Sequence, residues 1–228
     1  MAPYLVCWVY WSASMETAMK TRLLPAVREY LASCEQEWEQ ISETRQTQLE
    51  ELVRALRAQR RQTGEIRLIF ICTHNSRRSQ FAQVWSTAAA AYYGIPKVTC
   101  YSGGTETTAV APLVLQTLRE VGCIIQTNDT STNPHYKVQL FTEGPVLECY
   151  SKVYRDQANP QLGFLAITVC SDADQHCPIV EGASARVHLP YDDPKRADNT
   201  PQAQDTYRAT SRIICRELLW VFRQLREE

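Results

Sequence analysis

Hydrophobic residues recur at helical spacing in the first part of the chain and in short unbroken runs further on. Over residues 17–62 the apolar positions fall three or four residues apart, with Glu and Arg filling many of the others. This pattern predicts either two amphipathic helices with a break near residues 42–46 or one long bent helix, and Gly64 ends it. An apolar stripe usually belongs to a core, so we expect it to pack on the rest of the chain or on a second copy in a homodimer. A regulatory or partner-binding helix is the alternative.

The pattern changes after Gly64, where runs of apolar residues alternate with amphipathic stretches. We expect strands at residues 66–71, 98–101, 163–169 and 186–189, and helices at 79–93, 112–121 and 202–226. Such alternation predicts an α/β fold with a parallel sheet flanked by helices, preceded by a helical extension over residues 1–64. Residues 133–160 interrupt the pattern and are expected to form a hairpin or a surface flap.

Composition narrows the class of protein. The chain has 228 residues and a formal net charge of −1, which argues against a nucleic-acid partner. Its first thirteen residues are apolar but too short to span a bilayer, so we expect no membrane association, and Met15 and Met19 are alternative start sites. Nine cysteines without a recognisable signal peptide indicate a reducing cytoplasm, where thiols more often serve catalysis than structural disulfides.

The stretch "LIFICTHNSRRS" joins a buried strand to a helix through a cysteine and a polar loop. Ligands of open parallel sheets bind beyond the carboxyl ends of the strands, and a helix N-terminus there attracts anions and favours a thiolate. Arg78 follows Cys72 by six residues, so the loop can aim its guanidinium at the same anion. The pattern favours Cys72 as a nucleophile. A structural cysteine beside two exposed arginines is the alternative.

The sequence "CTHNSRRSQ" resembles the active-site loop of the low-molecular-weight protein tyrosine phosphatases and of the thioredoxin-coupled arsenate reductases. This resemblance implies a flavodoxin-like phosphatase fold, with residues 65–228 as the catalytic domain. It also implies that Cys72 is the nucleophile and Arg78 the oxyanion clamp. The rest of the oxyanion-binding loop would be Thr73, His74, Asn75, Ser76, Arg77 and Ser79. The family often has glycine at the position of His74 and a small residue or cysteine at Arg77, and a second arginine would make the rim more positive.

A second cysteine pair lies in "VCSDADQHCPIVEG", where Cys170 and Cys177 are seven residues apart. Seven helical residues rise about 10.5 Å, whereas a disulfide needs Cα atoms within about 7 Å. The segment between the two cysteines must therefore loop out or unwind if they bond. Two free thiols are the alternative, and a zinc site with His176 lacks the usual spacing. The segment resembles the redox segment of the arsenate reductases, which implies a thiol relay from Cys72 to Cys170 to Cys177.

The motif "LPYDDPKRADNT" offers a general acid, Asp192 or Asp193, in a loop before Pro194. A solvated acidic turn is the alternative. Both families place an aspartate before proline as the acid, which implies Asp193.

The sequence thus predicts an enzyme of cysteine-dependent oxyanion chemistry, most simply arsenate reduction with thioredoxin as partner. A phosphatase acting on phosphotyrosine or small phosphate esters is the close alternative, and a non-catalytic redox or phospho-binding regulator is the second. We assign no cofactor and no metal. Some arsenate reductases of this type bind potassium, but the matching positions lack the carboxylates that the family would have there; they are Asn75, Gln83, Ser102 and Thr132.

Overall fold

The computed structural model describes residues 22–176 and 179–226. The expectations for the first residues, the start sites and Cys177 lie outside this described part. Within it, no helix is both long enough and apolar enough to cross a membrane.

Four parallel strands form the central sheet, in the order β2-β1-β6-β7. They are β1 (Ile66–Cys72), β2 (Val98–Gly104), β6 (Phe164–Thr168) and β7 (Ala183–His188). Both β1 and β6 are central strands and almost wholly buried, which explains their unbroken apolar runs. The predicted parallel sheet flanked by helices is confirmed.

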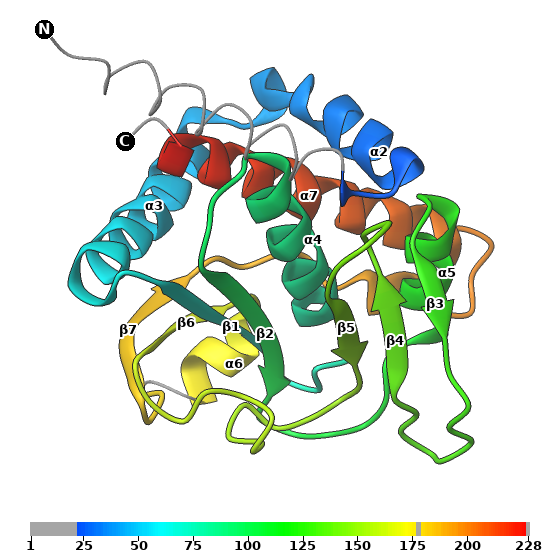
Figure 1. The fold of residues 1–228 in the computed structure, drawn as a ribbon. Helices are drawn as coiled ribbons and strands as arrows, with labels where there is room; N and C mark the ends of the chain where they lie inside the picture. Colours follow the sequence, from blue (N-terminus) through cyan, green and yellow to red (C-terminus); the bar gives the residue numbers. More distant parts are fainter. Residues whose placement is uncertain (1–21, 177–178, 227–228) are drawn as a thin grey trace, which may run out of the picture.

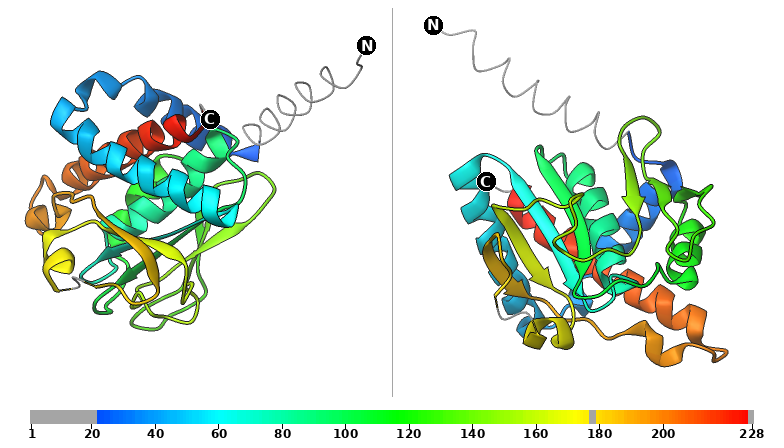
Figure 2. Two further views of the ribbon diagram at one scale, coloured as in Figure 1. Left: turned by 90° about the vertical axis from the view of Figure 1, so that its left-hand side faces the viewer. Right: turned by 90° about the horizontal axis from the view of Figure 1, so that it is seen from below.

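The helices follow the predicted order. They are α2 (Pro25–Glu35), the short η1 (Trp38–Gln40), α3 (Glu43–Thr63), α4 (Arg78–Tyr92), α5 (Pro112–Glu120), α6 (Ser171–His176), η2 (Pro194–Ala197) and α7 (Ala203–Arg226). The long helix α7 packs against α2, α3, α4 and α5 and so joins the N-terminal helices to the layer on the sheet (Figure 1). Figure 2 shows α2, α3 and α7 gathered on one side of the molecule, with the strands and α6 on the other.

In its described part, from residue 22 on, the N-terminal segment forms α2 and α3 with a break between them, which is one of the two arrangements that its pattern allowed. The Ser42 side chain accepts a hydrogen bond from the backbone of Arg45 and so caps the start of α3, while Gly64 ends that helix in the left-handed conformation at φ 74°. The apolar stripe is completely buried and belongs to the same hydrophobic cluster as β1; it includes Val27, Leu31, Leu49, Leu52 and Leu56. The stripe therefore packs within the chain itself.

Residues 133–160 contain the expected hairpin, made of β4 (Tyr136–Gln139) and β5 (Val146–Cys149). A third strand, β3 (Ile124–Gln126), pairs antiparallel with β4 and was not predicted. It has only three residues, none of them buried, so it carries no hydrophobic signal of its own. Its pairing is set by the hairpin beside it.

We expect Leu52→Ala to lower the free energy of unfolding by about 2–5 kcal/mol, because it empties space in a core shared by α3 and the sheet. Glu51→Ala, at an exposed neighbouring position, is the matched control and should change stability by less than about 0.5 kcal/mol. Urea unfolding of both variants measures the difference. Equal stabilities would show that α3 is not part of the cooperative fold.

Candidate active site

Cys72 ends the central strand β1, and its thiol is 4% exposed. Its Sγ lies 3.0 Å from the hydroxyl of Ser79, in the first turn of α4. That hydroxyl accepts a hydrogen bond from the Asn75 side-chain amide at 2.8 Å, which leaves its own proton for the sulfur. The arrangement directs a hydroxyl donor at the Cys72 sulfur.

The loop after Cys72 holds its shape through its carbonyl groups. The carbonyl oxygens of residues 72–76 each accept a hydrogen bond from a neighbouring segment, in order from Thr105 N, Glu106 N, Ser151 Oγ, Gln80 Nε2 and Ala111 N. Asn75 adopts a left-handed conformation at φ 47°, which asparagine tolerates better than most residues. Within the described residues, the N–H groups of residues 73–77 have no hydrogen-bond partner. Such unpaired donors beside the N-terminus of α4 are an arrangement that can accept an anion.

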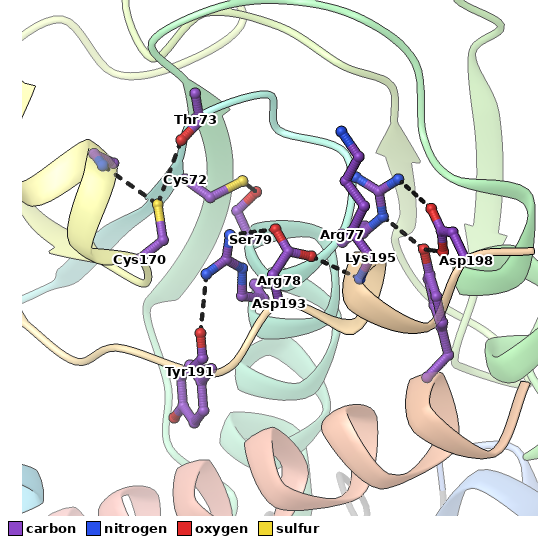
Figure 3. Close-up of polar contacts among 12 residues, drawn as sticks. Cys72, Thr73, Arg77, Arg78, Ser79, Cys170, Tyr191, Asp193, Lys195 and Asp198 are labelled. Carbon is purple, nitrogen blue, oxygen red and sulfur yellow. Dashed lines mark hydrogen bonds and ion pairs between the residues drawn. The ribbon is translucent and has the colours of Figure 1, made fainter. Parts of the chain in front are cut away.

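Arg78 brings a largely buried guanidinium to this loop. Its Nη1 donates to the carbonyl of Tyr191 at 2.9 Å, and its Nη2 donates to the Asp193 carboxylate at 2.5 Å (Figure 3). A charged fork held in this way is suited to bidentate contact with an oxyanion. The structure thus brings Arg78 and Asp193 together at the carboxyl end of the sheet.

The two neighbouring aspartates have different surroundings. The Asp192 side chain is 84% exposed and faces Arg196 at 3.6 Å, whereas Asp193 points toward Arg78. Asp193 also accepts a hydrogen bond from the backbone of Lys195 at 3.0 Å and so begins η2. Both residues line the cavity beside Arg78, but of the two carboxylates only that of Asp193 contacts the Arg78 guanidinium.

Arg77 points away from the anion site. Its Nε donates to the hydroxyl of Tyr207 at 2.6 Å and its Nη2 to Asp198 at 3.0 Å. Asp198 balances its charge, so the more positive rim expected from a second arginine does not arise. Of the other loop side chains, His74 faces Glu106 at 3.4 Å and Ser76 is buried.

Cys170 lies at the carboxyl end of β6, the strand next to β1. Its sulfur is 3.6 Å from the hydroxyl of Thr73 and accepts a hydrogen bond from Ala173 N at 3.4 Å (Figure 3). A cavity of about 480 Å³ is lined by Cys170, Arg78 and Asp193. The described part of the second cysteine motif therefore opens onto the same cavity as the arginine and the acid, while Cys177 lies outside the described residues.

Residues 150–154, after the hairpin, brace the loop and were not found from the sequence. Ser151 donates to His74 O, and the backbone N–H of Lys152 donates to Asn75 Oδ1 at 3.0 Å. Lys152 is 4% exposed, and burial lowers its pKa. The signal available was weak, since serine and lysine in an irregular stretch are ordinary surface residues.

The side chains at the four potassium positions are all uncharged. The carboxamide oxygen of Asn75 is already bound to Lys152 N–H, and Thr132 is exposed. Gln83 and Ser102 keep buried oxygens without hydrogen-bond partners, but no carboxylate accompanies them.

Similar proteins identify the chemistry. The chain is 32% identical over 127 residues to arsenate reductase 2 of Staphylococcus epidermidis, covering 56% of this chain and 77% of the relative. It is 31% identical over 137 residues to the arsenate reductase of Halalkalibacterium halodurans, covering 59% of this chain and 78% of the relative. The chain belongs to the arsenate reductase family. It is an enzyme of cysteine-based oxyanion chemistry.

This arsenate reductase family member also resembles solved structures of other proteins. A low-molecular-weight protein tyrosine phosphatase from Bacillus subtilis matches with a TM-score of 0.48 and 15% identity, over 72% of this chain and 99% of the other. An arsenate reductase in the phosphate binding state matches with a TM-score of 0.41 and 15% identity, over 70% of this chain and 98% of the other. No family model matches the chain.

Gly104 packs directly against the backbone of the loop after Cys72. A Cβ there would lie 2.6 Å from Thr73 O and 2.8 Å from Asn75 N, both backbone atoms of the oxyanion loop. We expect Gly104→Ala to displace the loop and weaken inorganic phosphate binding, together with activity, by about 10²-fold. Isothermal titration with phosphate, beside a thermal unfolding curve to verify folding, measures this effect. Phosphate affinity equal to that of the wild type would contradict the role given to the close contact.

Proposed function

We propose that this protein reduces arsenate to arsenite through a relay of Cys72, Cys170 and Cys177, with thioredoxin as the external reductant. The observation that carries the proposal is the position of Cys170, whose sulfur contacts the loop residue next to Cys72. Phosphate ester hydrolysis has no use for a second thiol there, whereas reduction requires one. The names of the relatives, all arsenate reductases, support the same substrate.

The first step is attack of the Cys72 thiolate on arsenic. The loop N–H groups and Arg78 stabilise the oxyanion, and Asp193 protonates the oxygen that leaves as water. The product is a covalent Cys72–arsenic(V) adduct, formed without any change in oxidation state.

The second step is the reduction. The Cys170 thiolate attacks the Cys72 sulfur and forms a disulfide, while the electron pair of the sulfur–arsenic bond stays on arsenic and arsenite leaves. Cys177 then attacks Cys170, which frees Cys72 and leaves a Cys170–Cys177 disulfide for thioredoxin to reduce. Helix α6 (Ser171–His176) separates these two cysteines, so it unwinds in the oxidised protein, because helical spacing exceeds disulfide geometry.

Hydrolysis of phosphate esters is the second candidate function. It is favoured by the contact of Cys72 with Ser79 and by the contact of Arg78 with Asp193, which would provide nucleophile, clamp and acid without any use of Cys170. An aryl phosphate therefore also serves as a probe of this part of the site.

Asp193→Asn should slow hydrolysis of phenyl phosphate by about 10²–10⁴-fold, because the leaving phenoxide needs a proton. A nitrophenyl phosphate, with a better leaving group, should be affected less. Asp192→Asn is the matched control and should behave as wild type, since its carboxylate is exposed and faces Arg196. Steady-state kinetics on both esters decide the assignment, and a larger effect from Asp192→Asn would transfer the acid role to that residue.

Cys177→Ser should block repeated turnover of arsenate and trap a Cys72–Cys170 disulfide, while aryl phosphate hydrolysis stays near the wild-type rate. Mass spectrometry after one equivalent of arsenate detects the bond, and Cys72→Ser should abolish both reactions. Cys100→Ala is the control, because burial raises the pKa of that thiol to about 12 and removes it from thiolate chemistry. The relay is falsified if Cys177→Ser turns over arsenate like wild type and forms no such bond.

A further inference from the structure

An ion pair lies behind the loop that carries Asp193. Arg45, in the first turn of α3, donates from Nε and Nη2 to one carboxylate oxygen of Glu217 on α7, at 3.0 and 2.9 Å. Their side chains are only 16% and 6% exposed. Removing two such charges from water is costly, so a buried pair is weak evidence of stabilisation by itself and calls for another role.

The same guanidinium holds the backbone just before the acid. Arg45 Nη2 also donates to the carbonyl of Pro190 at 3.0 Å, and its guanidinium carbon lies 4.8 Å from the centre of the Tyr191 ring. The carbonyl of Tyr191 in turn accepts from Arg78. The segment leading to Asp193 is therefore held by Arg45 on one side and by the oxyanion clamp on the other.

This segment separates two cavities. Pro190, Tyr191 and Asp192 line the cavity that contains Cys170 and Arg78, and they also line a second cavity of about 480 Å³ on the side of α3 and α7. Two backbone hydrogen bonds connect this segment to the end of β6: Leu189 N–H donates to Thr168 O, and Tyr191 N–H donates to Val169 O. The cavity beside α3 and α7 leaves room for this loop to shift away from Arg78. The hydrogen bond from Arg45 to Pro190 opposes such a shift.

We propose that Arg45, held by Glu217, is a positioning residue for Asp193. It fixes the loop so that the carboxylate meets both Arg78 and the oxygen that leaves the substrate. Arg45 does not touch the reacting atoms, so its effect passes through the acid. The inference rests on the proposed function, and it gives α3, which precedes the sheet, a part in the reaction.

The test compares a poor leaving group, phenyl phosphate, with a good one, 2,4-dinitrophenyl phosphate. Arg45→Met should lower kcat for phenyl phosphate by about 10-fold, a part of the full effect of a general acid, and change the second ester by less than about 3-fold. Arg45→Lys should fall in between, because an ammonium group lacks the planar fork. Arg54→Met, on the exposed face of the same helix, is the matched control and should have no effect.

A double variant separates positioning from general damage. In an Asp193→Asn background, Arg45→Met should cause no further loss, because the group it positions is already gone. Equal losses on both esters, or losses that add to that of Asp193→Asn, would overturn the proposal. If Arg45→Met alone fails to fold because Glu217 is left unpaired, Arg45→Met with Glu217→Gln removes the stranded charge and is tested in the same way.

A failure of the proposed function can be distinguished from a failure of the positioning role of Arg45. If the wild type turns over neither ester nor arsenate, that function is wrong, and amide hydrogen exchange decides the positioning claim. Exchange at Tyr191 N–H should then rise at least 10-fold in the Arg45→Met, Glu217→Gln variant relative to Arg54→Met. Unchanged exchange would overturn it.

Discussion

The structure depends on one constraint, that the loop after Cys72 must turn all its carbonyl groups outward. A short segment without helix or strand geometry can keep its N–H groups facing an anion only if each carbonyl has a partner elsewhere. Those partners come from four places: the segment after β2, the residues before α5, the first turns of α4, and Ser151 beyond the hairpin. The shape of this loop therefore depends on segments from several parts of the fold.

The buried side chain of Arg78 also depends on hydrogen-bond partners from distant segments. A buried guanidinium needs compensation, and it finds a carbonyl at Tyr191 and a carboxylate at Asp193. One side chain thus joins the loop after Cys72 to the segment that carries Asp193. The similarity to arsenate reductases covers 56–59% of the chain, and the N-terminal helices add Arg45 to the far side of this loop.

Within the same motif, neighbouring residues take opposite directions. Arg77 and Arg78 are adjacent in the sequence, but Arg77 precedes α4 with non-helical backbone angles (φ −133°, ψ −87°) and Arg78 is the first helical residue, so one meets Asp198 and the other meets Asp193. Asp192 and Asp193 also diverge, because the side chain of Asp193 caps η2 and that of Asp192 does not. Such pairs look equivalent in a sequence, since only the surrounding surfaces distinguish them.

The sequence by itself determined the order of the strands and helices of the main sheet and the loop joining Cys72 to Arg78, because each leaves a local signal of periodicity or spacing. It left open whether the N-terminal helical pattern breaks and whether residues 133–160 form a hairpin or a surface flap. The tertiary structure alone decided which aspartate faces Arg78, how Lys152 and Ser151 brace the loop, and that Arg45 reaches Pro190. Those contacts join residues from about 75 to 145 positions apart, and their side chains have no pattern until the sheet brings the segments together.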